Sequence, residues 1–248
     1  MEIPSPPKGS GSHPVALVVI SANDLAASSA FYSRMFGWQL QKMSPELSAG
    51  VPPAGPMMAL RSNIPNGFPG MVPYIGVPDV DATLARVVAA GGTVEKATWS
   101  LPMVGKLARF KDAGGTIYGL TDTASPGGAP YIPMPLGSNP KPPAGAICSM
   151  EMYLADGAQA GFFSEQFGWG ILASMPQYTT FDPGAGPGGV FQSHTASLPA
   201  LLYIYDADVE ARLTEIDANG GKRLGAPMRR PGRGCFGYVK DPSGTTMG

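Results

Sequence analysis

The chain has 248 residues, of which 44% are hydrophobic and 14% charged, and its formal net charge is −1. A net charge this close to zero does not indicate the basic surface that binds nucleic acid or an anionic membrane. No apolar run approaches the roughly 18 residues of a membrane span, and the first residues lack the pattern of a secretory signal. We therefore expect a cytoplasmic globular protein, a monomer or a homodimer, that binds neither nucleic acid nor membrane.

The elements of the first half can be followed in chain order. Residues 1–12 are mostly Pro, Gly and Ser and are expected to form a flexible arm. Two helices are predicted, one opened by Asp24 and ended by Gly37, the other opened by Asp79 and ended by the Gly91–Gly92 pair. Strands are expected at residues 14–21, 38–41, 56–61, 71–77, 106–110 and 116–120, and a Pro/Gly loop is expected between the second and the third of them. This order is β-α-β-β, then β-α-β-β again.

The second half repeats the first without a gap over long stretches. Tyr74 corresponds to Tyr203, and Asp112 to Asp241, at an offset of 129 residues. Earlier in the chain, the segment AFYSRMFGW is answered by GFFSEQFGW at an offset of 131 residues. A period this long is not that of a solenoid and indicates two copies of one domain. We place the copies at residues 13–122 and 147–248, joined by a Pro/Gly-rich linker at 123–146.

The two cysteines, Cys148 and Cys235, could form one bridge by number. A chain of this length buries a core of its own and does not need such a bridge, so free thiols are predicted.

Four features recur in both copies in the same order. They are an aromatic pair in the first helix, a Phe-Gly-Trp sequence at its end, an Asp at the start of the second helix, and a final Asp-x-x-Gly turn. In this respect the chain resembles the vicinal oxygen chelate superfamily, which includes glyoxalase I, bleomycin-resistance proteins and extradiol dioxygenases, and it looks most similar to two-domain glyoxalase-like bacterial proteins. The resemblance implies an α+β fold of two tandem modules built from βαβββ units, with curved mixed sheets that enclose a cavity.

The same resemblance implies where a metal would be bound. Enzymes of the superfamily hold a divalent ion with His and Glu side chains on the first strand, on the strand before the second helix, and near the end of the last strand. In this chain those positions hold apolar, glycine or serine residues, with one exception, Glu151. They are Leu17 or Val19, Val72 and Gly119 in the first copy, and Ser149 or Glu151, Leu201 and Gly248 in the second.

The histidines of the chain do not replace the missing ligands in the sequence pattern. His13 lies at the edge of the flexible arm, and His194 lies in a turn between two expected strands. A catalytic metal site normally needs about three protein ligands. The sequence therefore predicts that the familial metal site has been lost and that no cofactor is present, the alternative being a divalent ion such as Fe, Mn, Ni or Zn.

Glu151 is the unusual residue of the second copy. Strand alternation places Glu151 and Tyr153 on one face of the segment CSMEMYLA, whereas the matching strand of the first copy carries no charge. A carboxylate inside a cavity is costly unless it is hydrogen-bonded or paired. Glu151 is thus a candidate general base or a polar group that binds substrate. Alternatively, it is a former ligand position that is now tied to an arginine such as Arg109 or Arg233, or is hydrated at the mouth of the cavity.

Other candidate substrate-binding residues lie in two places. Trp99 has no aromatic counterpart in the second copy, which makes it a candidate for a pocket wall. Arg229 and Arg233 belong to a loop with three arginines, whose planar guanidinium groups suit carboxylates or phosphates. With Tyr153 and Arg109 they complete the set of expected binding residues.

The function expected from the sequence is the binding of a small organic ligand by a protein of the glyoxalase and bleomycin-resistance type that lacks the metal. One alternative is a metal-dependent lyase, isomerase or dioxygenase of the same superfamily. Another is a metal-free acid–base enzyme that uses Glu151, and a third is an interaction module without a small-molecule role.

Overall fold

The computed structural model describes residues 13–64, 68–102, 104–123, 141–193, 200–230 and 234–248. The first half runs β-α-β-β-β twice. Its elements are β1 (Val15–Ser21), α1 (Leu25–Phe36), β2 (Gln39–Ser44), β3 (Leu47–Val51), β4 (Met57–Arg61), β5 (Met71–Gly76), α2 (Val80–Ala89), β6 (Thr93–Leu101), β7 (Gly105–Lys111) and β8 (Ile117–Thr121).

Two of these strands were not predicted. The segment expected to be a Pro/Gly loop contains β3, where a Cβ on Gly50 would lie only 1.7 Å from the backbone oxygen of Gln39. Only glycine therefore allows this close approach to β2. The other missed strand, β6, is an edge strand that is mostly exposed, so its sequence lacks a continuous apolar face. Its hydrogen bonds to β7 form the strand instead.

The second half follows the same order with shorter final strands. Its elements are β9 (Ile147–Tyr153), η1 (Gly157–Gln159), α3 (Ala160–Phe167), β10 (Gly170–Met175), β11 (Tyr178–Asp182), β12 (Gly189–Gln192), β13 (Ala200–Ile204), α4 (Val209–Ala218), β14 (Lys222–Arg223), β15 (Met228–Arg230), β16 (Gly234–Phe236), β17 (Val239–Lys240) and β18 (Thr246–Met247).

Helix boundaries agree with the predicted signals. The side chains of Asp24 and Asp79 accept hydrogen bonds from backbone N–H groups three residues on, at 2.9 and 3.0 Å. Gly37 ends α1 with a φ of 69°, and Gly168 ends α3 with a φ of 67°. These left-handed conformations favour glycine, which explains the repeated Phe-Gly-Trp sequence.

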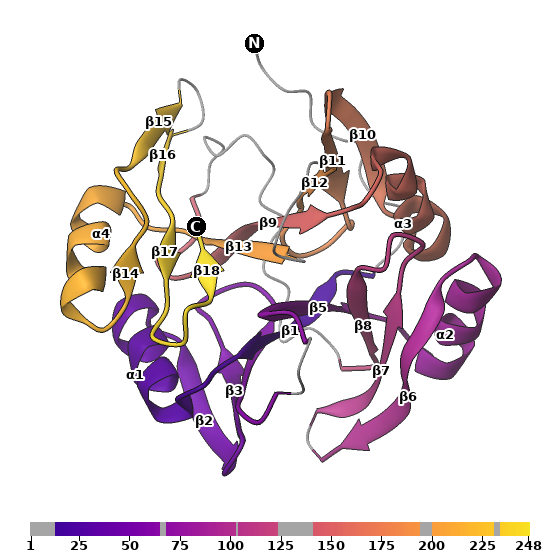
Figure 1. Cartoon of the computed structure of the whole chain (residues 1–248), viewed down its shortest axis with the longest axis horizontal. Coiled ribbons are helices and arrows are strands. Elements are labelled where there is room, and N and C mark those ends of the chain that lie inside the picture. Colours follow the sequence, from indigo (N-terminus) through magenta and orange to yellow (C-terminus); the bar gives the residue numbers. More distant parts are fainter. Residues whose placement is uncertain (1–12, 65–67, 103, 124–140, 194–199, 231–233) are drawn as a thin grey trace.

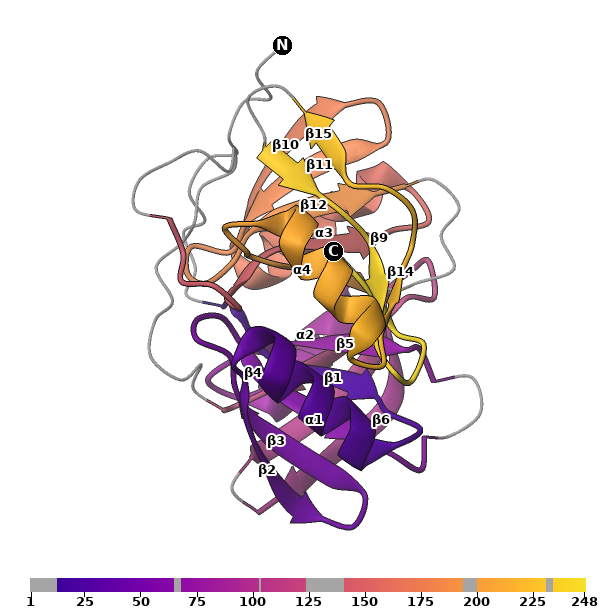
Figure 2. The same ribbon diagram turned by 90° about the vertical axis from the view of Figure 1, so that its left-hand side faces the viewer.

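Two curved sheets form the molecule (Figures 1 and 2). The first sheet has the strand order β2-β3-β4-β1-β5-β8-β7-β6, so that two βαβββ units join edge to edge through β1 and β5. The second sheet has the order β10-β11-β12-β9-β13 and is accompanied by two small sheets, β14-β17-β18 and β15-β16. This is the α+β architecture of curved mixed sheets expected from the sequence.

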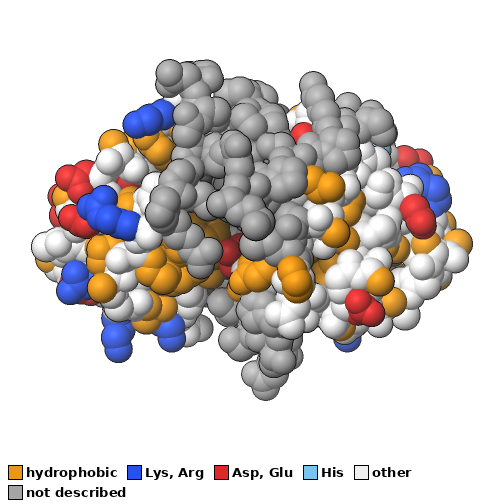
Figure 3. Space-filling model, turned by 90° about the horizontal axis from the view of Figure 1, so that it is seen from above, with side chains coloured by type: hydrophobic (Ala, Val, Ile, Leu, Met, Phe, Trp, Pro, Cys, Tyr) orange, Lys and Arg blue, Asp and Glu red, His pale blue; other side chains and the backbone are white. Residues whose placement is uncertain are grey.

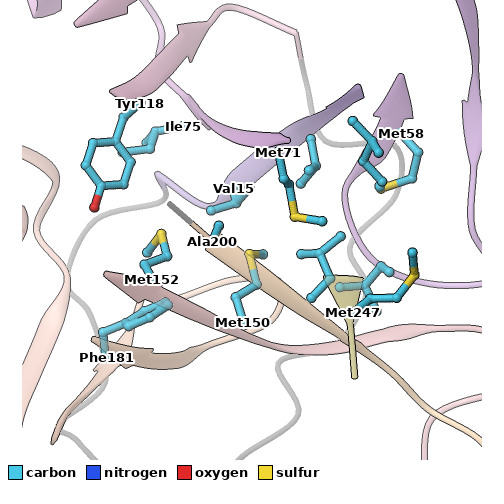
Figure 4. Packing of buried hydrophobic residues seen from close by; sticks show 14 of the residues in the cluster. Val15, Met58, Met71, Ile75, Tyr118, Met150, Met152, Phe181, Ala200 and Met247 are labelled. Carbon is cyan, nitrogen blue, oxygen red and sulfur yellow. The ribbon is translucent and has the colours of Figure 1, made fainter. Parts of the chain in front are cut away.

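The sheets pack back to back through a shared core. Alternate residues of β1 and β9, among them Val18 and Met150, belong to one buried cluster that draws on both halves. Methionines from both sheets meet there, as Met58, Met71, Met150, Met152 and Met247 in Figure 4 show. Unbranched thioether side chains fill irregular gaps between surfaces that are not complementary in shape. The two concave faces consequently open away from one another, one at the bottom and one at the top of Figure 1.

Matching tryptophans connect the halves. Trp38 donates a hydrogen bond from Nε1 to the backbone oxygen of Gly145 at 2.9 Å, just before β9. Trp169 donates in the same way to the oxygen of His13 at 2.8 Å, just before β1. His13 also lies with Nδ1 3.1 Å from the oxygen of Gly76. Gly145, within the segment expected to be the linker, is buried, whereas residues 124–140 of that segment lie outside the described residues.

Both cysteines are free, as predicted. Burial raises the pKa of the Cys148 thiol to about 12, so this thiol is neutral and unreactive at physiological pH. No described helix combines the length and apolar character needed to cross a membrane.

The two copies differ at a buried aspartate. Tyr32 on α1 donates its hydroxyl to Oδ2 of Asp241 at 3.1 Å. The counterpart of Tyr32 in the second copy is Phe163, which has no hydroxyl, and Oδ2 of the matching Asp112 is buried without a partner among the described residues. Burial raises the pKa of both aspartates, Asp112 and Asp241.

Replacing Tyr32 by phenylalanine should lower the free energy of unfolding by about 1–3 kcal/mol at pH 7, since a buried carboxylate loses its donor. The hydroxyl favours the charged form of Asp241. Its contribution should therefore shrink as the pH falls through the raised pKa of that carboxyl. Urea unfolding at pH 7 and near pH 4 measures both effects.

The reverse substitution, Phe163→Tyr, provides the matched control. A hydroxyl placed there should reach Asp112 and raise the stability at pH 7, because the folded-state penalty for the charged carboxylate is reduced. Equal stability of Tyr32→Phe and the unmodified protein at pH 7 would contradict the assignment.

Candidate functional site

The concave faces of the two sheets form two cups with different linings. We call the concave face of the first sheet the first cup, lined by Val19, Val72, Tyr74, Leu107 and Arg109. We call the concave face of the second sheet the second cup, lined by Glu151, Tyr153, Leu201, Tyr203 and Tyr238. The first five residues are all buried, whereas four of the second five are only half-buried. The first cup is thus packed with its own side chains, and the second is partly open.

Figure 3 views the molecule from the side onto which the second cup opens. Hydrophobic side chains gather toward the middle of this face, and charged side chains lie mainly toward its periphery.

Glu151 lies at the centre of a hydrogen-bonded cluster in the second cup. Its Oε1 accepts a hydrogen bond from the hydroxyl of Tyr203 at 2.7 Å, and its Oε2 accepts one from Tyr153 at 3.4 Å. The hydroxyls of Tyr203 and Tyr238 are 3.0 Å apart. A chain of three oxygen-bearing groups therefore runs from Tyr238 through Tyr203 to the carboxylate.

The phenols of Tyr203 and Tyr153 stay protonated. Burial, followed by the charge of Glu151, raises the pKa of Tyr203 and of Tyr153 well above the usual value. Protonated phenols donate to the carboxylate and favour its charged form. The aromatic rings of Tyr203, Tyr238 and Phe236 meet edge to face or at a tilt, with centroids 6.0–6.4 Å apart. The second cup thus combines a carboxylate with an aromatic wall.

The positions at which the superfamily binds metal do lie together, but they do not fit an ion. Val19 is paired directly with Val72 across β1 and β5, and Glu151 is paired with Leu201 across β9 and β13. Each cup therefore brings at most one carboxylate to these two positions, and a valine or leucine side chain has no donor atom for a cation.

The third position is blocked by a tyrosine ring in both copies. A Cβ built on Gly119 would lie 2.0 Å from the ring of Tyr74, and one on Gly248 would lie 2.4 Å from the ring of Tyr203. A His or Glu side chain would need the space that the ring fills. Over the described part of the chain, no group of three His, Cys, Asp or Glu side chains is arranged to hold a metal ion.

The first cup contains a different polar cluster. Arg109 is 5% exposed and forms an ion pair with Glu95, in which Nη2 and Oε1 are 3.3 Å apart. Its guanidinium carbon lies 4.9 Å from the ring centre of Phe68 and 5.6 Å from that of Trp99. Lys96 places Nζ 4.2 Å from the ring centre of Trp99. Trp99 is therefore in contact with two cations.

The predicted binding residues are distributed over three places. Glu151 and Tyr153 share the second cup, whereas Trp99 and Arg109 share the first. The hypothesis that Arg109 pairs with Glu151 is wrong, because Arg109 pairs with Glu95 in the other half. Arg229 has a side chain that is 73% exposed, forms an ion pair with Glu210 at 2.6 Å, and lies with Glu210 at the edge of a cavity beside α4. Arg233 and His194 lie outside the described residues.

Sequence reasoning missed two tyrosines of the hydrogen-bonded cluster around Glu151, namely Tyr203 and Tyr238. Tyr203 was noticed only as the counterpart of Tyr74, and Tyr238 was not singled out. The alternation of β13 was a usable signal for Tyr203, because it puts this residue on the same face as Leu201, opposite Glu151. Tyr238 lies in the break between β16 and β17, so no strand pattern marked it.

A cavity of about 310 Å³ lies beside α4 in the second half, lined by Leu213, Ile216 and Gly248 among others. Its lining also includes Tyr203 and Phe236 of the second cup. The cavity therefore adjoins the second cup, and we assign no separate ligand to it.

Comparisons with known proteins agree with this architecture. Residues 17–116 match the family model described as "Glyoxalase-like domain". The protein named "Putative glyoxylase CFP32" from Mycobacterium bovis is 26% identical over 245 residues, which covers 92% of this chain and 90% of that protein. Its namesake from Mycobacterium tuberculosis matches to the same extent.

Solved structures share the fold at low sequence identity. The Mn(II)-bound glyoxalase from Novosphingobium aromaticivorans superimposes with a TM-score of 0.68 at 17% identity, covering 96% of this chain and 81% of that one. The 2,3-dioxygenase LapB from Pseudomonas sp. KL28 gives a TM-score of 0.66 at 15% identity, covering 99% and 92%. Residues 17–116 thus match a glyoxalase-like domain, and the chain has the fold of these glyoxalase and dioxygenase structures.

Proposed function

We propose that this protein binds a small organic molecule in the second cup, with Glu151 as the central polar group and without the divalent metal of the superfamily's enzymes. The observation that supports it most directly is the half-exposed carboxylate held between Tyr203 and Tyr153 on the concave face of the sheet. Ligand sites in proteins typically combine an apolar or aromatic wall with a few fixed polar groups.

A second candidate function is metal-free acid–base catalysis in the same cup. The hydrogen-bond chain from Tyr238 through Tyr203 to Glu151 favours it, because such a chain can deliver a proton to the carboxylate or remove one. Glu151 would accept a proton from the substrate, and Tyr203 would hold the carboxylate in position. Turnover that survives the change Glu151→Gln would exclude the carboxylate as the base.

Two measurements test the binding function. First, protein purified without chelators is titrated calorimetrically with Mn²⁺, Fe²⁺, Ni²⁺ and Zn²⁺. We expect no tight one-to-one binding, since the ligand positions hold Val72, Leu201 and two glycines covered by tyrosine rings. Stoichiometric tight binding of one ion would overturn the metal-free assignment and would favour a metal-dependent lyase, isomerase or dioxygenase.

Second, a panel of small aldehydes, amines, phenols and carboxylic acids is screened by ligand-observed NMR. Ligands of the second cup should bind about tenfold more weakly to Glu151→Gln, because a charge-assisted hydrogen bond is lost. Glu165→Gln is the matched control, since Glu165 is an exposed carboxylate on α3. If no compound binds, or if every compound binds both variants equally, the second cup is not the ligand site.

A further inference from the structure

The two cups carry opposite charge. The concave side of the first sheet brings together three cationic side chains, Arg61, Lys96 and Arg109, and one carboxylate, Glu95. Arg61 lies on the same face of β4 as Met57 and Ala59, which pack in the first cup. The described lining of the second cup has Glu151 and neutral phenols instead.

Structural pairing accounts for only one of the three cations. Arg109 is neutralised by Glu95 and flanked by Phe68 and Trp99. Lys96 and Arg61 form no ion pair with any carboxylate in the described residues. Burial, and then the charges of Arg109 and Arg61, lower the pKa of Lys96, whereas the charge of Glu95 raises it. Three cations thus share one carboxylate, Glu95, and the repulsion between like charges favours the binding of a further anion.

The surroundings of these cations are apolar and aromatic. The first cup is lined by Val104 and Leu107, and Phe68, Trp99 and Leu101 pack against this cluster while remaining partly exposed. Lys96 lies over one of these rings. An inorganic anion would contact the cations but not the apolar and aromatic side chains. A carboxylate attached to an apolar group would contact both.

We propose that the mouth of the first cup is a second ligand site, specific for a small organic anion in which a carboxylate is carried on an aromatic or apolar body. Lys96 and Arg61 bind the carboxylate, and Trp99 and Phe68 contact the apolar body. The site is independent of Glu151 and of the function proposed for the second cup.

Isothermal titration calorimetry with 1-naphthoate, its neutral analogue 1-naphthamide, and inorganic phosphate tests the assignment. We expect 1-naphthoate to bind one-to-one and about tenfold more tightly than 1-naphthamide, because the carboxylate gains charge-assisted hydrogen bonds. Phosphate should bind more weakly than 1-naphthoate. Raising the salt concentration should weaken the binding of 1-naphthoate, since Lys96 is exposed and its charge is screened.

Variants locate the site. Lys96→Gln and Arg61→Gln should each weaken 1-naphthoate binding about three- to tenfold, while Lys96→Arg retains the charge and should bind within about twofold of the unmodified protein. Lys42→Gln removes an equally exposed cation on β2, and should leave the affinity unchanged. Lys96 and Lys42 are exposed and Arg61 is half-buried, so we expect all of these variants to keep the fold.

Four results would overturn the proposal: no binding of 1-naphthoate at millimolar concentration, equal binding of 1-naphthamide, equal binding by Lys96→Gln and Arg61→Gln, or loss of binding in Glu151→Gln alone. The last result would place the anion in the second cup. Conversely, a failure of all ligands to respond to Glu151→Gln would overturn the function proposed for the second cup without affecting the first.

Discussion

Replacing Trp38 by alanine is expected to lower the free energy of unfolding by about 3–5 kcal/mol, the usual cost of truncating a buried aromatic side chain. Trp38 is 2% exposed and stacks on Tyr32 with ring centres 4.5 Å apart. Its Nε1 also donates a hydrogen bond to the backbone oxygen of Gly145, which lies just before β9 of the second half. Urea unfolding followed by far-UV circular dichroism measures the loss.

Trp38→Phe separates the two contributions. Phenylalanine retains most of the apolar ring and removes the donor, so that the buried oxygen of Gly145 loses its partner at a cost of about 1–3 kcal/mol. Trp169→Phe should behave alike, because Trp169 makes the matching bond to His13. If both phenylalanine variants are as stable as the unmodified protein, the hydrogen bonds between the halves do not contribute to stability.

Gly119→Ala is the second substitution with a large expected effect. The new Cβ would lie 2.0 Å from the ring of Tyr74, a side chain that is 2% exposed, and we expect a loss of about 1–3 kcal/mol through overpacking. Gly161→Ala is the control, because a Cβ there meets nothing within 4 Å and α3 should gain up to about 1 kcal/mol from better helix propensity. Thermal unfolding of the three proteins measures the difference.

The outcome bears on the chemistry of the site. A large loss in Gly119→Ala supports the conclusion that the tyrosine ring fills the space of a third metal ligand. If Gly119→Ala is instead as stable as Gly161→Ala, the ring of Tyr74 moves aside at little cost. The third position would then be open to a larger side chain, and the argument against a metal at this position would fail.

The candidate site was predictable only in part. The placement of Glu151 and Tyr153 on one face follows from the alternation of a single strand, and the positions that correspond to metal ligands follow from the resemblance to the superfamily. The tyrosines of this cluster were not predictable in the same way, because they are distant from Glu151 in the chain. Tyr203, which donates to Glu151, is 52 positions away, and Tyr238, which bonds to Tyr203, is 87 positions away. The pairing of Arg109 with Glu95 likewise depends on the register of β6 against β7, which contains two irregularities.

By itself, the sequence determined the features that depend on neighbouring residues: the duplication, the helices begun by Asp24 and Asp79, the glycines that end them, and an α+β fold of two tandem modules. Such features arise from local hydrogen bonds and backbone conformation. Only the tertiary structure decided that the sheets pack back to back, that a tyrosine ring covers Gly119 and another covers Gly248, and that the cups differ in charge. These properties depend on side chains that are distant in the chain and are brought together by strand pairing and core packing, which no local pattern specifies.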